Sequence, residues 1–591
     1  MKNLIKIMVC AVVLAGFTSC FKDLDNPPID PKVTQIFNQD AIFVKVYATL
    51  GLTGLEGPAG SGDVDGIDEG TSAFSRMIWE LQEFPADDIW WVWDSDAGLP
   101  AIRNLSWTSS NELSVGLYYR LYFDITMCNF FLQNTEKETD EKSVKQRAEV
   151  RFIRALNYYY LLDMYGEGVP FADKIADVVP MPAEDMPKPK TRVELYTWIE
   201  TELLAIEPDM FAVGAKTGYF RADQAAVWLL LSRLYLNAEV YTGTANWNKA
   251  AEYAGKVMTS SYTLATEYRH LFMGDNDNLS SVNTASSELI LPIPQDGIQT
   301  KSYGGSLVLI AGSHVNGMLP WGSSEQWECF RAKPTLVKKF FPDLAVADLI
   351  YEYEDVVPAL AGDDRALFSA KLRIDTAFVI KEENGKKYTL NGQTEYPAGS
   401  GLYPKEIDYT LATQPDSWKA ATAFDTLPHL TGGAINGSAG FSNCWQIAKF
   451  SNLYASGAQS HDPRWTDTDI PFMRAAEAYL TYAEAVLRGG AATNGSAAEA
   501  IAALRNRAHA TPLPNVTLDD IFDEWSREFY AEGRRRSDLV RFNKFAGAVN
   551  YNWEGKGGTA DGKDVDAKYN IYPIPSKDLN ANPNLTPSEG Y

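Results

Sequence analysis

The chain is poor in cysteine, histidine and basic residues, and each shortage argues against a class of function. Five cysteines occur in 591 residues, with no CxxC pair, which argues against a disulfide framework and a structural zinc site. The histidines are scattered and lack the spacing of catalytic zinc ligands: His270, His314, His429, His461 and His509. The 77 acidic residues outnumber 53 basic ones, for a net charge of −24. Such a surface repels phosphate backbones, so no nucleic acid partner is expected and a neutral ligand is favoured.

The first twenty residues have the pattern of a secretory signal. Lys2 and Lys6 precede an apolar run over residues 7–17, too short to span a membrane, and small residues then lead to Cys20. Residues 14–20 resemble a loose bacterial lipobox, which would make Cys20 the lipidated first residue of the mature chain. Ordinary secretion with cleavage nearby is the alternative. We therefore predict a signal peptide over residues 1–19 and an anchored protein outside the cell, since residues 21–25 look like a surface-export tract.

Once the signal peptide is removed and Cys20 carries lipid, three cysteines remain. Cys128, Cys329 and Cys444 lie far apart, and their number is odd. We expect them to be small, buried apolar side chains.

Helical periodicity dominates two long blocks of the chain. We expect a helix over residues 39–50, a helix with Phe152 and Tyr159 on one face that ends at Gly166, and a helix over 191–207. The last begins with Thr191-x-x-Glu194, the pattern of a capping box. Two helical pairs follow, over 225–239 with 247–258 and over 475–487 with 497–508. Small residues at the first pair would allow close packing, as in a tetratricopeptide repeat: Ala226, Ala250, Ala251 and Ala254.

Residues 280–470 differ from these helical blocks. Gly, Ser, Thr and Asn are frequent there, periodicity is poor, and short strand-like runs occur at 289–291 and 378–380. Loops on a rigid scaffold tend to carry function, so a ligand-binding region is expected here. The Pro-rich tail at 572–585 is expected to pack over the surface.

Several long motifs, in the same order along the chain, resemble the SusD/RagB family of outer-membrane nutrient-binding lipoproteins. They are residues 147–156, 525–542 and 572–575; shorter segments similar to starch-binding members are 68–70, 295–297, 302–305, 361–367 and 468–471. The resemblance implies a mostly α fold in which four tetratricopeptide-type helical pairs support the loop-rich region. It also implies a non-catalytic protein that captures starch or malto-oligosaccharides, and a TonB-dependent transporter of the SusC type as partner.

The same resemblance implies a glycan site at Arg76, Trp93, Asp96, Tyr303 and Trp327. Indole and phenol rings left open to water can lie flat against the apolar faces of sugars, and an arc of rings selects a curved glucan. Asp96 departs from the family pattern, in which an Asn is expected, and an ionised Asp can only accept hydrogen bonds. Three Trp occur within residues 90–93, so some must pack inward, and each ring could instead belong to the core.

No cofactor is expected to be required, but structural calcium is a prediction. Oxygen ligands alternate over residues 275–278, and Asp467 and Asp469 could add carboxylates, so we name Asp277 and Asp467 as candidate ligands. Residues 63–68 also look calcium-like but lack the distal Glu of an EF-hand loop. A plain acidic turn is the alternative at both places.

Two other functions compete with glycan binding. A surface glycosidase would need two carboxylates at a set separation in one cleft, and no hydrolase motif is visible. Glu528, Glu532 and the arginines near them are better explained as helix charges that pair at i and i+4. A helical-repeat scaffold for a peptide or for the transporter alone is the third possibility.

Overall fold

The computed structural model describes residues 37–58, 60–176, 181–277, 282–314, 321–340, 361–370, 378–383, 386–390, 445–559 and 561–591. Helices dominate this part of the chain, as predicted. The predicted signal peptide, Cys20 and Cys444 lie outside it. Cys128 and Cys329 are buried and unpaired, as expected. Over the described ranges, no helix combines the length and apolarity needed to cross a membrane.

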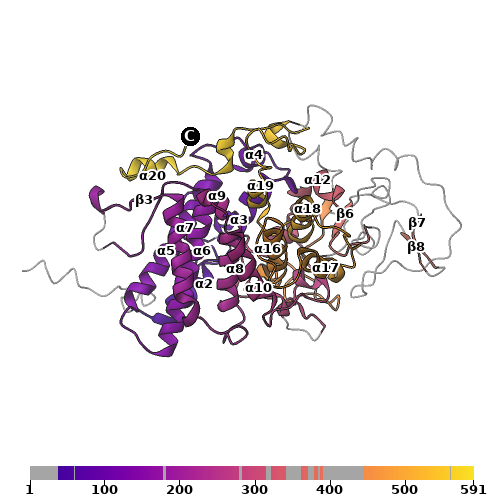
Figure 1. Cartoon of the computed structure of the whole chain (residues 1–591), viewed down its shortest axis with the longest axis horizontal. Coiled ribbons are helices and arrows are strands. Elements are labelled where there is room, and N and C mark those ends of the chain that lie inside the picture. The colour runs from indigo at the N-terminus through magenta and orange to yellow at the C-terminus, as the bar shows by residue number, and fades with distance from the viewer. Residues whose placement is uncertain are drawn as a thin grey trace, which may run out of the picture.

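The N-terminal half is built on long, packed helices. Helix α2 (Gln39–Ala48) packs on α5 (Glu112–Asn134), α5 packs on α6 (Glu141–Met164), and α6 packs on α7 (Arg192–Ile206). Figure 1 shows this group side by side. Side chains cap the helices at Asn111, Asp140 and Thr191, and the predicted capping box of Thr191 with Glu194 is complete. The second half of α6 is buried on every side, so its apolar residues occupy more than one face of the helix.

Two helical pairs lie where the sequence predicts them. Helix α8 (Gln224–Leu236) packs on α10 (Trp247–Met258), and the four predicted small residues on these two helices are fully buried. The predicted helix over 225–239 is interrupted at Asn237, after which a short α9 (Ala238–Thr242) begins. In the second pair, α16 (Ala476–Leu487) packs on α17 (Ala497–Arg507) and also on α10 and α18 (Leu518–Phe529). The count of four repeats stays a prediction.

Short elements fill the rest of the described chain. The further helices are α3 (Phe74–Glu83), α4 (Leu99–Arg103), α11 (Ser306–Ala311), α12 (Pro334–Lys338), α19 (Arg535–Arg541) and α20 (Ser576–Ala581). The strands form antiparallel pairs: β1 (Ile89–Trp91) with β5 (Phe330–Ala332), β2 (Val169–Pro170) with β3 (Pro189–Lys190), β4 (Leu289–Ile293) with β10 (Ile470–Arg474), β6 (Phe368–Ala370) with β9 (Trp445–Ile447), and β7 (Phe378–Glu383) with β8 (Lys386–Leu390). The predicted strand-like runs at 289–291 and 378–380 lie in β4 and β7, and the loop-rich character of residues 280–470 as a whole stays a prediction.

A buried network of charges fastens strand β10 to the C-terminal helices. The Arg474 guanidinium contacts Glu288 at 2.9 Å, Glu528 at 2.7 Å and Glu532 at 2.8 Å, and all four side chains are almost fully buried. Arg365 reaches the same helix through Glu524 at 2.7 Å. The prediction that Glu528 and Glu532 pair with nearby arginines along one helix is therefore wrong, because the chain bends between α18 and α19 and their partners come from distant segments. Arg534 and Asp538 do pair at i and i+4, at 3.2 Å.

The C-terminal segment crosses the top of the helices in Figure 1 and is part of the core rather than a simple cover. The Tyr572 backbone N–H donates to the Met164 carbonyl at 2.7 Å, and its hydroxyl donates to the Leu81 carbonyl at 2.7 Å. Tyr572 and Ile574 are buried. This segment thus joins α3 and α6.

Candidate functional site

The β1–β5 ladder brings the two predicted glycan segments together. Trp91 pairs with Phe330, and the Val92 N–H donates to the Cys329 carbonyl at 2.9 Å. Continuing this antiparallel register places Trp93 beside the residues that follow Trp327. Two segments more than 200 positions apart therefore meet at one end of a short ladder.

The three neighbouring Trp side chains divide between core and surface. Trp90 and Trp91 are buried, whereas Trp93 is 37% exposed and lies with its ring 6.1 Å from that of Trp91. The expectation that some of the three pack inward is confirmed. Trp321, which precedes Trp327 by six positions, is buried and stacks on His314.

A second group of rings gathers at the loop before α11. Tyr303 and Trp327 are half-buried, with ring centres 6.1 Å apart and planes inclined by 47°. The half-buried Trp465 joins them, 5.2 Å from Tyr303 and inclined by 59°. The rings are thus partly open to water and mutually tilted, so they do not form one flat plane.

Trp465 and its neighbour Arg464 were missed from the sequence. Nothing in their local pattern marks them, because their partner Tyr303 lies 161 positions from Arg464. The Arg464 guanidinium donates to the Tyr303 hydroxyl at 2.9 Å and pairs with Glu325 at 2.9 Å. A signal of this kind is visible only in three dimensions.

Arg76 and Asp96 supply polar groups beside the rings. From α3, Arg76 donates to the Glu80 carboxylate at 2.8 Å and to the Tyr303 carbonyl at 3.3 Å. Partial burial raises the pKa of Asp96, while the Trp91 side chain and the Arg76 charge act in the opposite direction. Arg76 therefore lies beside Tyr303 and is close enough to Asp96 to act on its charge, and the β1–β5 ladder brings Trp93 toward the residues that follow Trp327.

The predicted calcium residues lie at residues 275–277 and in the segment just before β10, which follows Trp465 in the chain. Asp275, Asp467 and Asp469 are buried, and each leaves one carboxylate oxygen without a hydrogen-bond partner. Burial raises the pKa of Asp469 far above its usual range, and the charges of Asp277 and Asp467 raise it further. These orphaned oxygens fit a cation. Across the described ranges, however, no three acidic, His or Cys side chains are arranged to hold a metal by themselves, so backbone or amide oxygens would have to complete the shell.

The second calcium-like segment is bonded differently. Asp63 pairs with Lys45 at 2.8 Å and with Arg120 at 3.4 Å, and Asp68 accepts from the Thr71 backbone N–H at 3.2 Å. These contacts agree with an acidic turn.

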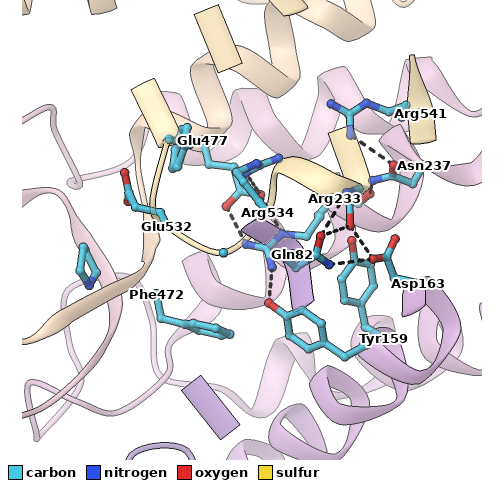
Figure 2. A pocket seen from close by; sticks show the side chains of 15 residues that line it. Gln82, Tyr159, Asp163, Arg233, Asn237, Phe472, Glu477, Glu532, Arg534 and Arg541 are labelled. Atoms are coloured by element: carbon cyan, nitrogen blue, oxygen red, sulfur yellow. Dashed lines mark hydrogen bonds and ion pairs between the residues drawn. The ribbon is translucent and has the colours of Figure 1, made fainter. Parts of the chain in front are cut away.

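A pocket lined by residues of α3, α6, α8, β10, α16 and α19 is shown in Figure 2. Arg233 and Arg534 both bond to Glu477 in its wall, at 2.7 and 3.2 Å, and Gln82 donates to Asp163 at 3.2 Å. Its volume is about 40 Å³, room for roughly three water molecules. The pocket is too small for a sugar ring.

The fold and the motifs define a class of protein: the chain belongs to the SusD family, as its sequence motifs indicated. A family model described as SusD family matches residues 420–591, and another, described as starch-binding and associating with the outer membrane, matches residues 91–236. One particular relative is the starch-binding protein SusD of Bacteroides thetaiotaomicron. The two sequences are 41% identical over 593 residues, covering 100% of this chain and 99% of the relative.

Solved structures of low sequence identity share the fold. The surface glycan-binding protein A of Bacteroides thetaiotaomicron, in complex with laminarihexaose, superposes with a TM-score of 0.61 at 17% identity, over 93% of this chain and 98% of that one. A SusD superfamily protein of Parabacteroides distasonis gives 0.60 at 17% identity, over 94% and 100%. A laminarin-binding SusD-like protein gives 0.59 at 18% identity, over 94% and 99%. The predicted mostly α, SusD-like fold is confirmed.

Proposed function

We propose that this protein is a non-catalytic glycan-binding protein of the outer-membrane surface that captures starch or malto-oligosaccharides. The observation that carries the proposal is the pair of half-buried rings of Tyr303 and Trp327 beside Arg76, with the partly exposed Trp93 at the end of the ladder that joins the two predicted segments. Rings bind the apolar faces of sugars by excluding water, and charged groups hydrogen-bond the hydroxyls. Because the rings are partly exposed rather than enclosed, the site suits a long chain better than a small molecule.

The tilt between the rings favours a curved ligand. A flat array would suit an extended β-glucan, whereas planes inclined by 47° and 59° suit the helical turn of an α-1,4-glucan. The starch-binding name of the relative at 41% identity supports the same choice. Another neutral glycan is the alternative, since structures with the same fold are named for laminarin or laminarihexaose.

Isothermal titration tests the proposal, with maltoheptaose, α-cyclodextrin and laminarihexaose as ligands. Heat with the first two is expected, and it should disappear in the Trp93→Ala, Trp327→Ala double variant. Unchanged binding in that variant would favour a site elsewhere, and heat with laminarihexaose alone would assign a β-glucan. Incubation with starch should release no reducing ends; their release would identify a glycosidase.

The proposal includes attachment and delivery. We propose that lipid on Cys20 holds the protein on the outer membrane, facing the exterior, and that it passes glycan to a SusC-type TonB-dependent transporter. The family description that includes association with the outer membrane supports this location. Expression of the full chain with labelled palmitate should label the wild type and leave Cys20→Ala unlabelled and free of the membrane. Co-purification of a transporter from the native membrane tests the partner.

We also propose that calcium binds among Asp275, Asp277, Asp467 and Asp469. A divalent cation would satisfy the orphaned oxygens and offset the mutual repulsion of the carboxylates. Added calcium should raise the Tm of chelator-treated protein, and Asp469→Asn should remove that response. The same Tm with and without calcium would contradict the proposal.

A further inference from the structure

The rings of the candidate site are joined by a chain of hydrogen bonds. The Trp327 indole N–H donates to one oxygen of Glu325 at 3.1 Å, and Arg464 Nε contacts the other at 2.9 Å. The Arg464 Nη2 group then donates to the Tyr303 hydroxyl at 2.9 Å. Glu325 and Arg464 thus link the polar edges of two rings, and we call this ion pair the ring clamp.

The ring clamp rests on two loops that are themselves fixed. The Ser324 N–H donates to the Pro463 carbonyl at 2.6 Å, so the loops that carry Glu325 and Arg464 are bonded through their backbones. Asp462 accepts from the backbone N–H groups of Arg464 at 2.7 Å and Trp465 at 3.1 Å. A clamp on such loops can hold a ring orientation before any ligand arrives.

The clamp also brings a further ring to the site. The Arg464 guanidinium lies 5.1 Å from the centre of the Trp465 ring and 5.8 Å from that of Tyr303. The planar guanidinium therefore lies against both rings as well as bonding to the Tyr303 hydroxyl. Since Trp465 is half-buried, part of its ring remains open to a ligand.

We propose that Trp465 is a ligand-contacting ring and that Glu325 and Arg464 are positioning residues that set the tilt of Tyr303 and Trp327 for a curved α-glucan. This inference rests on the proposed function and adds to it the residues that determine specificity. Without the clamp, both rings would gain rotamer freedom, which a ligand would have to remove on binding. Ordering one such side chain costs about 3- to 10-fold in affinity.

The test is titration of Glu325→Gln, Arg464→Met and the double variant with α-cyclodextrin and maltoheptaose. Each single variant should bind both ligands about 3- to 10-fold more weakly than the wild type. The double variant should bind no more weakly than the weaker of the two single variants, because both substitutions break the same connection. Arg464→Lys, which keeps a charged donor, should regain part of the loss. Trp465→Ala should bind both ligands about tenfold more weakly, because the ring contact is missing.

A matched control is provided by Lys249 and Glu200, a pair 2.7 Å apart on α10 and α7 with side-chain exposures of 45% and 20%, against 48% and 24% for the ring clamp. Lys249→Met and Glu200→Gln should leave affinity unchanged. Additive losses, or wild-type affinity in all clamp variants and in Trp465→Ala, would overturn the inference while leaving the proposed function intact. Absence of glucan binding by the wild type would remove both.

Discussion

At the scale of single residues, Asp96 places a carboxylate where the resemblance to the SusD family implies an amide. An ionised Asp accepts hydrogen bonds from sugar hydroxyls but donates none, whereas Asn does both. One added donor is worth about 0.5–1.5 kcal/mol, so Asp96→Asn should tighten maltoheptaose binding by roughly 2- to 10-fold in titration. Partial burial raises the pKa of Asp96, so acidification should supply an O–H donor and tighten wild-type binding. The Asn variant should lack this pH dependence; equal pH profiles would contradict it.

Arg474 shows how strongly one buried charge can matter. Replacing it by Met leaves Glu288, Glu528 and Glu532 buried without this partner, and breaking a buried ion pair in this way costs about 3–5 kcal/mol. Urea unfolding of Arg474→Met should show a loss of that size. The control is Lys142→Met, whose pair with Asp40 is exposed at 59% and 63% and should change stability by less than about 0.5 kcal/mol. Similar losses in the two variants would contradict the role of burial.

At the scale of helices and strands, local signals were predictable and distant contacts were not. The start of α7 follows from Thr191 and Glu194, and the close packing of α8 on α10 follows from four alanines, because both depend on spacing within a few turns. No Gly or Pro in the sequence predicts the break at Asn237. The burial of Trp321 and the partial exposure of Trp465 depend on partners far along the chain, so neither could be derived from the sequence.

The cap of α7 allows a local test. Thr191 accepts from the Glu194 N–H at 3.2 Å and Glu194 accepts from the Thr191 N–H at 2.9 Å, so Thr191→Ala removes half of the capping box. The loss is expected to be about 1 kcal/mol, and amide exchange in the first turn of α7 should accelerate by roughly fivefold. Thr201→Ala, on the exposed face of the same helix, serves as the control and should leave that exchange unchanged. Equal protection in the two variants would contradict a stabilising cap.

At the scale of the whole molecule, charge is divided between surface and core. The net charge of −24 keeps anionic polymers away from the surface, while the interior holds ion pairs that tie segments distant in sequence. Arg535, for example, joins α19 to Asp87 at 2.6 Å, near the start of β1. The loops that carry the candidate site are therefore fastened to the helical scaffold by charged groups whose protonation must affect stability.

The free energy of unfolding should consequently decrease both toward acidic pH and toward pH 8. Burial alone would raise the pKa of Glu524, but the charges of several arginines outweigh it and lower the pKa to about 2. Glu524 therefore contributes to stability above its ordinary pKa of 4.5, and this contribution is lost as the pH falls toward 2. Glu83 is the opposite case. Burial raises its pKa to about 8. The contribution of Glu83 to stability is therefore complete below pH 4.5 and is lost as the pH rises to 8.

The Glu83→Gln variant separates the loss of stability toward pH 8 from the loss toward acidic pH. Glu83 accepts from the Gly533 N–H at 2.7 Å and the Arg534 N–H at 3.1 Å, and an amide oxygen can accept both bonds without ever becoming charged. Urea unfolding at pH 5, 6, 7 and 8 should show that the wild type loses stability toward pH 8 more steeply than the variant. Between pH 5 and pH 3 the two should lose stability in parallel, since the Glu524 pairs are unchanged. A variant with the same slope as the wild type between pH 5 and pH 8 would mean that Glu83 is charged in the folded protein.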